Sequence, residues 1–290
     1  MRLAPLAIVL LFLGIIMSLS GCGPVSSARI EKSLTGEFPR DGLLLVDTRN
    51  GAIEVQVDGA RTDMLVRATI RAGGATAEEA QQRADQATIE IAVTSNALIE
   101  VRARLPEPRH PNDGASLHVT VPSAPAGIDL RTSNGGITAA DVDGAAIMVT
   151  SNGNVVARDI RGKVTTTTSN GSIELERVAS GSLLTSNGAV SVTDVTGAIS
   201  VSTSNGDVRL IEISGPAEIG TSNGNIELVA RENFAGVIDA STSNGKVTLV
   251  GGGTVLRSES DQRSGRIEFR TAGPPSTLRT SNGSIEITTK

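Results

Sequence analysis

The feature that most constrains this chain is a repeat of about eighteen residues built around the tripeptide Ser-Asn-Gly. Successive glycines of the intact copies lie 18, 18, 17, 18, 18, 21 and 38 residues apart, and the last interval divides into 20 and 18 if the degenerate Ser264-Gly265 is counted. A threonine precedes the tripeptide in every intact copy. A fixed period of this length predicts one structural unit per repeat, stacked on its neighbours. The repeated pairs are Asn134, Gly135, Asn152, Gly153, Asn170, Gly171, Asn187, Gly188, Asn205, Gly206, Asn223, Gly224, Asn244, Gly245, Asn282 and Gly283.

Each copy predicts a strand that leaves the turn. The second residue after every glycine is Val or Ile, as at Ile137, Val155 and Ile173, and the fourth is usually apolar. Such alternation with β-branched residues is typical of a strand with one buried face. In regular copies the next apolar residue comes at the seventh position, as at Ile160. This change from even to odd offset predicts a corner, so each repeat is expected to contain two short strands.

Two architectures satisfy this pattern. In both of them Asn-Gly is expected to supply the corner because both residues tolerate a positive φ. In an antiparallel β meander, each Asn-Gly would be a two-residue hairpin turn. In a parallel β-helix, each repeat would be one coil, and equivalent positions would lie on top of one another. We favour the parallel β-helix because the unchanged Thr-Ser-Asn-Gly string is best explained by stacking, with the Asn side chains hydrogen-bonded in a ladder. Nine coils are expected.

The composition fits a narrow core without aromatic packing. The 290 residues include no Trp, no Tyr and four Phe, against 32 Gly. Small and β-branched side chains must therefore fill the interior. The same scarcity argues against base stacking on single-stranded nucleic acid. Lys and Arg number 26 against 31 Asp and Glu, a net charge of −5, so no nucleic-acid partner is expected.

The N-terminus has the pattern of an exported protein. Arg2 precedes an uncharged stretch, 3–19, that is rich in Leu and Ile, as in an export signal. The following Leu19-Ser20-Gly21-Cys22 resembles the bacterial lipoprotein signal, which implies cleavage before Cys22, a lipid on its sulfur and acylation of the new amino terminus. Several acyl chains would hold the protein firmly on a membrane. A transmembrane anchor is the alternative. Many inner-membrane lipoproteins of Gram-negative bacteria carry Asp directly after the lipidated Cys. This resemblance therefore implies, from Gly23, the outer membrane in a cell that has one.

Four regions are expected along the chain: a lipoprotein signal peptide over 1–21, a linker over 22–40, a β-rich capping region over 41–130 and the repeat β-helix over 131–290. In the capping region, Thr76 and Glu79 form a capping box that predicts a short helix to about Gln86. This helix is expected to cover the open end of the solenoid, because an uncovered coil edge invites aggregation.

Residues 40–290 resemble the bacterial putative-adhesin family of unknown function, whose members carry β-strand repeats. The resemblance rests on Val46-Asp47-Thr48-Arg49-Asn50-Gly51, on Leu117-His118-Val119-Thr120-Val121-Pro122, and on the repeats that follow. It implies an all-β fold, a right-handed single-stranded parallel β-helix, and it implies no tested activity. The chain departs from the regular pattern over 229–234 and again over 251–263.

The sequence contains no catalytic motif and too few histidines for a histidine metal site, since His110 and His118 are the only two. We therefore expect no enzyme activity, no cofactor and no metal. Because Asn readily hydrogen-bonds its own turn, the Asn ladder is expected to be structural. The expected function is a lipid-anchored protein of the bacterial cell envelope, acting as a non-catalytic, adhesin-like interaction or structural module toward a glycan or protein partner. The alternatives are a regulatory or stress-response lipoprotein that docks a protein, and a β-helical polysaccharide-active enzyme.

Overall fold

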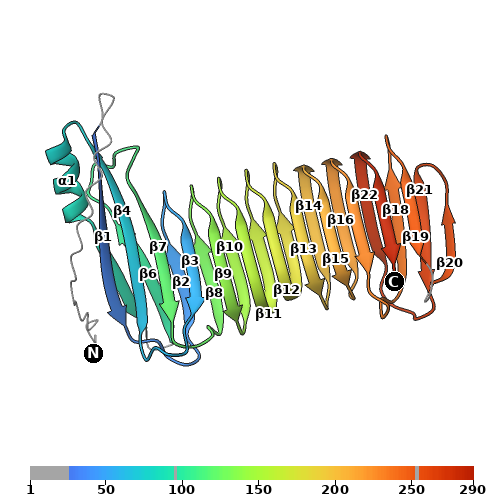
Figure 1. The fold of residues 1–290 in the computed structure, drawn as a ribbon, viewed down its shortest axis with the longest axis horizontal. Coiled ribbons are helices and arrows are strands. Elements are labelled where there is room, and N and C mark those ends of the chain that lie inside the picture. Colours follow the sequence, from blue (N-terminus) through green and yellow to red (C-terminus); the bar gives the residue numbers. More distant parts are fainter. Residues whose placement is uncertain (1–25, 95–96, 252–254) are drawn as a thin grey trace. The chain divides into compact units, whose positions relative to one another are not determined.

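The computed structural model describes residues 26–94, 97–251 and 255–290. The expected signal peptide and Cys22 lie outside this part of the chain. The chain divides into two compact units, Met1–Gly144 and Ala145–Lys290. The described residues form twenty-three strands and one short helix (Figure 1). The predicted all-β class is confirmed.

The first unit is built from two sheets. One contains, in spatial order, β1 (Ser26–Gly36), β4 (Met64–Gly74), β7 (Gly114–Val121), β3 (Ile53–Val57) and β9 (Ile137–Val142). The other contains β5 (Thr88–Val93), β6 (Leu98–Arg104), β2 (Leu43–Asp47) and β8 (Gly127–Arg131). Pairing is antiparallel at β1–β4, β4–β7 and β5–β6 and parallel elsewhere. The turn-and-strand repeat thus begins inside this unit.

The coil made by β2 and β3 does not stack in sequence order. Val46 pairs with Val101 on one side and Leu130 on the other. Ile53 likewise lies between two later residues, Leu117 and Ile137. The first coil of the chain is therefore inserted between two coils that follow it in sequence. Its neighbours on one side are β6 and β7, and on the other side β8 and β9.

The capping helix forms as predicted. α1 (Ala77–Gln86) begins at the N-cap Thr76, whose hydroxyl accepts a hydrogen bond from the Glu79 N–H at 3.1 Å. Its apolar face, Ala80 and Ala84, is fully buried, and the helix packs against β1 and β4. A side-chain carbon on Gly74 of β4 would lie 2.5 Å from the Ala80 nitrogen. This glycine gives the helix its close approach to the sheet.

The expected linker over 22–40 is wrong over most of its length. Residues 26–36 form β1, which pairs antiparallel with the whole of β4, and Ile30 opposite Ile70 is buried. The segment lacks a clean alternation of apolar and polar residues, because most of its side chains are only half-buried. Its pairing comes from main-chain hydrogen bonds to β4, which the sequence pattern does not reveal.

The second unit also contains two sheets. The first sheet consists of the N-terminal halves of β11 (Val155–Thr167) and β12 (Ile173–Leu184), followed by β13 (Val190–Val195), β15 (Val208–Ile213), β17 (Ile226–Ala230), β23 (Ile285–Thr289) and β19 (Val247–Gly251). The second sheet consists of β10 (Ala145–Val149), the C-terminal halves of β11 and β12, β14 (Ile199–Asn205), β16 (Ala217–Asn223), β22 (Ser276–Asn282), β18 (Val237–Thr242), β21 (Ser264–Phe269) and β20 (Val255–Ser260).

Repeats in this unit stack one coil on the next. Ile173 pairs in parallel with Val155 on one side and Val190 on the other, which are its equivalents in the neighbouring copies. The inward residues of both sheets, such as Leu175 and Val201, are almost fully buried and form the core. The parallel β-solenoid is confirmed, and the antiparallel meander is wrong for these repeats.

The order of the last coils differs from the sequence order. β22 pairs with β16 on one side and β18 on the other, so the C-terminal coil of β22 and β23 is inserted before the coil of β18 and β19. The degenerate copy Ser264-Gly265 is not a coil. It belongs to β21, which pairs antiparallel with β18 and β20. The expectation of nine stacked coils is therefore wrong, because the segment around Ser264-Gly265 pairs antiparallel with both of its neighbours.

Candidate functional site

Stacked turns form a ladder of asparagine side chains along the second unit. Each amide nitrogen donates a hydrogen bond to the amide oxygen of the adjacent coil, at 2.8 to 3.0 Å. The order is Asn152, Asn170, Asn187, Asn205, Asn223, Asn282 and Asn244. In the first unit, Asn134 donates to Asn50 at 2.6 Å. Because the C-terminal coil is inserted, Asn282 precedes Asn244 in the ladder.

The threonine before each tripeptide has a distinct task. Its hydroxyl donates to the carbonyl oxygen of a tripeptide glycine in the neighbouring coil, as from Thr168 to Gly153 at 3.1 Å and from Thr242 to Gly283 at 2.8 Å. Thr168 is 2% exposed. A buried hydroxyl must find such a partner, and valine in its place would leave the carbonyl without that bond.

The tripeptide glycines serve close packing rather than turn conformation. None of them has a positive φ; the glycine with one, in the described part of the chain, is Gly236. A side-chain carbon on Gly188 would lie 2.0 Å from the Gly171 carbonyl oxygen of the adjacent coil. The expectation that these glycines are selected for positive φ is wrong, because backbone stacks directly on backbone here.

Positive φ occurs instead at the opposite corner of each coil. Asp159, Arg177, Asp194 and Glu212, each six residues after a tripeptide glycine, have φ between 54° and 61°. This kink explains the shift from even to odd apolar offsets. The corner residues also pair: Arg177 contacts Asp159 at 2.6 Å, and its hydrogen bond lowers the pKa of Asp159.

In the second unit, charged groups on the outward face of the first sheet, which contains β13 and β15, are largely paired with each other. Arg158 contacts Glu174 at 2.6 Å and Glu176 at 3.0 Å. Arg209 contacts Glu227 at 3.3 Å. These exposed pairs span adjacent coils.

The outward face of the second sheet of this unit, which contains β14 and β16, is different, because it is rich in small and hydroxylated residues. The residue before each Thr-Ser-Asn-Gly string lies in one row, which runs Leu184, Ser202, Gly220, Arg279 and Ser241 in spatial order. Beside it runs a row of Ser182, Ser200, Glu218, Thr277 and Asp239. Two hollows open on this face around Arg279.

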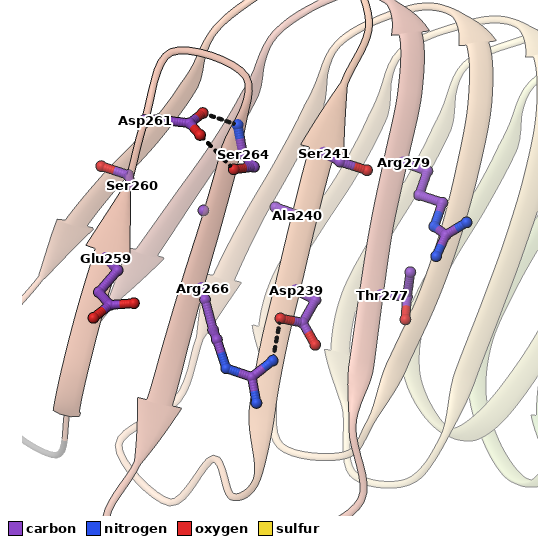
Figure 2. A pocket seen from close by; sticks show the side chains of 11 residues that line it. Asp239, Ala240, Ser241, Glu259, Ser260, Asp261, Ser264, Arg266, Thr277 and Arg279 are labelled. Carbon is purple, nitrogen blue, oxygen red and sulfur yellow. Dashed lines mark hydrogen bonds and ion pairs between the residues drawn. The ribbon is translucent and has the colours of Figure 1, made fainter.

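The hollow nearer the β20–β21 hairpin is shown in Figure 2. Arg266 contacts Asp239 at 2.5 Å. Asp261 accepts hydrogen bonds from the N–H groups of Arg263 and Ser264, which lower its pKa. The carboxylates of Asp239 and Asp261 are therefore both bonded to groups of the β20–β21 hairpin. The Arg279 side chain extends along its strand toward Thr277 (Figure 2), and sequence reasoning missed this residue because its neighbours depend on the inserted coil.

A buried ion pair in the first unit ties the capping helix to the loop before β7. Asp113 is 2% exposed and accepts from Arg83 of α1 at 2.5 Å, from the His110 N–H at 2.8 Å and from the Gly73 N–H at 3.0 Å. Burial opposes the charge of Asp113, but these hydrogen bonds and the Arg83 charge together lower its pKa. The arrangement is a structural clamp, because the carboxylate is fully occupied by protein groups.

The two histidines make different contacts in the first unit. His118 on β7 contacts Glu54 at 3.0 Å, and the His110 backbone binds Asp113. Within 26–94, 97–251 and 255–290, no group of three or more His, Cys, Asp or Glu side chains could hold a metal ion. Over the same residues, no helix is long and apolar enough to span a membrane.

Several proteins resemble this chain in structure. A putative adhesin from Bacteroides fragilis NCTC 9343 is 12% identical, with a TM-score of 0.46, over 90% of this chain and 97% of its own. A putative adhesin from Parabacteroides distasonis ATCC 8503 is 9% identical, with a TM-score of 0.44, over 92% of this chain and 98% of its own. A putative cell adhesion protein from Clostridium sporogenes ATCC 15579 is 9% identical, with a TM-score of 0.26, over 91% and 100%. No curated protein matches the chain.

The sequence of the chain matches one family over more than half its length. The match covers residues 109–288 and is to the family described as Toastrack DUF4097. These residues include all of the intact Thr-Ser-Asn-Gly copies. The predicted family resemblance is thereby confirmed, and the chain belongs to the Toastrack DUF4097 family.

Proposed function

We propose that the chain is a lipid-anchored protein of the bacterial cell envelope whose solenoid is a non-catalytic, adhesin-like binding module. The observation that carries the binding role is the outward face of the second sheet between β14 and β18, which combines two hollows with exposed hydroxyl groups. Hydroxyl-rich, weakly charged faces suit a hydrated ligand such as a glycan, since they bind through hydrogen bonds without burying much apolar area.

A lipid at Cys22 would place the folded protein close to its membrane. β1 begins at Ser26, four residues after Cys22. At about 3.5 Å per extended residue, this tether reaches at most about 14 Å. The first unit would therefore lie against the lipid surface, with the outer membrane favoured in a Gram-negative cell.

A non-catalytic role is supported by the state of the ionisable groups. The carboxylates around the hollow of Figure 2 accept bonds from protein groups, as Asp239 does from Arg266. A polysaccharide-active enzyme needs two free carboxylates facing a common substrate. The carboxylates of Asp239 and Asp261 instead accept hydrogen bonds from Arg266 and Ser264.

Lipidation is tested by feeding cells an alkyne analogue of palmitate and comparing the wild-type chain with Cys22→Ala. Label in the membrane fraction that disappears in the variant supports the anchor. Equal labelling of both chains, or release of the wild-type protein into the soluble fraction, contradicts it.

Binding is tested with the Cys22→Ser mature protein on an array of envelope glycans, together with a pull-down from envelope extract. Saturable retention of one glycan class without release of smaller products supports the binding module. Cleavage of the bound glycan would establish the enzyme alternative. A single protein partner with no glycan signal would establish the docking alternative.

A further inference from the structure

We propose that the hollow between Gly220 and Ser241, centred on Arg279, is a subsite for the acidic group of an anionic saccharide. This inference rests on the proposed binding function and assigns its site and ligand class. Arg279 belongs to β22, the inserted C-terminal strand, and pairs in register with Gly220 of β16 and Ser241 of β18. Stacking in sequence order would place Ser241, and not Arg279, next to Gly220, so the central position of Arg279 depends on the inserted coil.

The hollow has room beside the guanidinium. A side-chain carbon on Gly220 would have no heavy atom within 4 Å outside its own chain neighbours, so the row is open at this position. The lining of the hollow comes from β14, β16, β22, β18 and the turns after them, and Arg279 is its one charged residue in the described chain. The other lining residues are Ser, Thr and Gly.

Arg279 has no carboxylate partner among the described residues, although other arginines in this unit do. Arg266 takes Asp239 at 2.5 Å, and Arg209 on the first sheet takes Glu227 at 3.3 Å. An exposed guanidinium with free donors favours a carboxylate, sulfate or phosphate that it can bind through two parallel hydrogen bonds. The unpaired Arg279 therefore marks the place where an anionic group binds.

Hydroxyl groups surround this cation. The side chains of five exposed serines in the lining make no hydrogen bond within the described protein: Ser202, Ser222, Ser241, Ser243 and Ser281. They can donate to and accept from sugar hydroxyls. The chain has no Trp or Tyr, so recognition cannot use sugar stacking on those rings and must use these polar contacts.

Of the two acidic residues beside the site, Asp239 is paired with Arg266, and Glu218 gives the proposal a sign test. Glu218 lies on β16, two residues before Gly220, is exposed, and has no ion-pair partner among the residues that the structure describes. Its charge repels an incoming anion, weakly because the site is open to water and salt. Removing the charge of Glu218 should strengthen binding, whereas removing the charge of Arg279 should weaken it.

The experiment uses calorimetric titration of the Cys22→Ser mature protein with tetragalacturonate, with neutral galactotetraose and with a sulfated tetrasaccharide. Wild-type protein is expected to bind one or both acidic probes and not the neutral one, which separates carboxylate from sulfate as the acidic group. Arg279→Gln should weaken binding at least about tenfold. Glu218→Gln should strengthen it about twofold. Arg209→Gln, which removes the same charge from the other sheet, should leave it unchanged.

Filling the hollow gives an independent test without a change of charge. Gly220→Val adds a side chain that strands accept readily and that meets open space. Thermal unfolding should stay within about 1 °C of wild type while binding of the acidic probe is lost. Equal loss of binding in Arg279→Gln and Arg209→Gln would overturn the site, because it would indicate general charge attraction.

Failure of this site is distinguishable from failure of the proposed function. If galactotetraose binds as tightly as the acidic probes and Arg279→Gln has no effect, the anionic subsite is wrong while the binding module stands. If no glycan binds either in titration or on the array, the binding function is wrong as well.

Discussion

A side-chain carbon placed on Gly171 would lie 1.9 Å from the carbonyl oxygen of Gly153 in the adjacent coil. The backbones of stacked turns therefore touch, and nothing larger than hydrogen fits between them. Gly171→Ala should destabilise the second unit by about 1–3 kcal/mol, because the coils must move apart to accept one methyl group. Urea unfolding of the mature protein measures this change.

Gly220 provides the matched control for that substitution, since it also lies in a strand-turn repeat but faces open space. Gly220→Ala should leave the free energy of unfolding within about 0.5 kcal/mol of wild type. Equal destabilisation by both substitutions would contradict the assignment of close backbone contact to the tripeptide glycines.

The asparagine ladder contributes to stability through hydrogen bonds that cross coils. Asn205 donates to Asn187 and accepts from Asn223, both at 2.9 Å. Asn205→Ala should lower the free energy of unfolding by about 1 kcal/mol, the net value of exposed hydrogen bonds being small. Ser204→Ala, next to it and exposed, should change it by less than about 0.5 kcal/mol. Similar values for the two variants would make the ladder energetically irrelevant.

The buried Asp113 makes the stability of the first unit sensitive to acid. Its pKa in the folded protein is lowered, so its contribution is present above the unfolded pKa of about 3.9 and is lost as the pH falls through the lower folded value. Asp113→Asn should cost about 3–5 kcal/mol at pH 7, because it leaves the charge of Arg83 unbalanced. Unfolding followed from pH 7 to pH 2 should show a smaller loss of stability in the variant than in wild type. An identical pH dependence would exclude this carboxylate as the source.

A solenoid tolerates the loss of a whole coil. Deletion of residues 154–171 joins Gly153 to Ser172, which restores the repeat register, and should give a folded second unit with one coil fewer. Deletion of half a coil, 154–162, shifts inward residues outward and should prevent folding. Far-ultraviolet circular dichroism and cooperative thermal unfolding distinguish the two. A folded half-coil deletion would contradict the stacked register.

Local features of this fold were predictable because they are encoded in repeated positions. The Val and Ile after each glycine mark buried strand residues such as Ile173, and the capping box at Thr76 marks the start of α1. Stacking follows from the shared Thr-Ser-Asn-Gly string. The reason for the glycine was not predictable, because positive φ and close approach select the same residue, and contact with Gly153 decides between them.

Long-range order was not predictable from the repeat. Copies of one string are interchangeable as neighbours, so the pattern cannot tell whether the coil at Asn244 or the coil at Asn282 follows Asn223. The candidate subsite inherits this ambiguity. Arg279 is visible in the sequence as the residue before the last Thr-Ser-Asn-Gly, yet its neighbour Gly220 comes from a repeat 59 positions earlier, 279 − 220.

The most direct test of the account is disulfide trapping across the inserted coil, on which both the fold order and the Arg279 hollow depend. In a Cys22→Ser background without other cysteines, the structure places Ser222 beside Ser281, since Asn223 pairs with Asn282. Adjacent strands about 4.8 Å apart allow a disulfide, whereas strands two coils apart do not. Ser222→Cys with Ser281→Cys should therefore crosslink rapidly under mild oxidation, and Ser222→Cys with Ser243→Cys should stay reduced. Crosslinking of the second pair in place of the first would contradict the account, because it would mean that the coils follow sequence order.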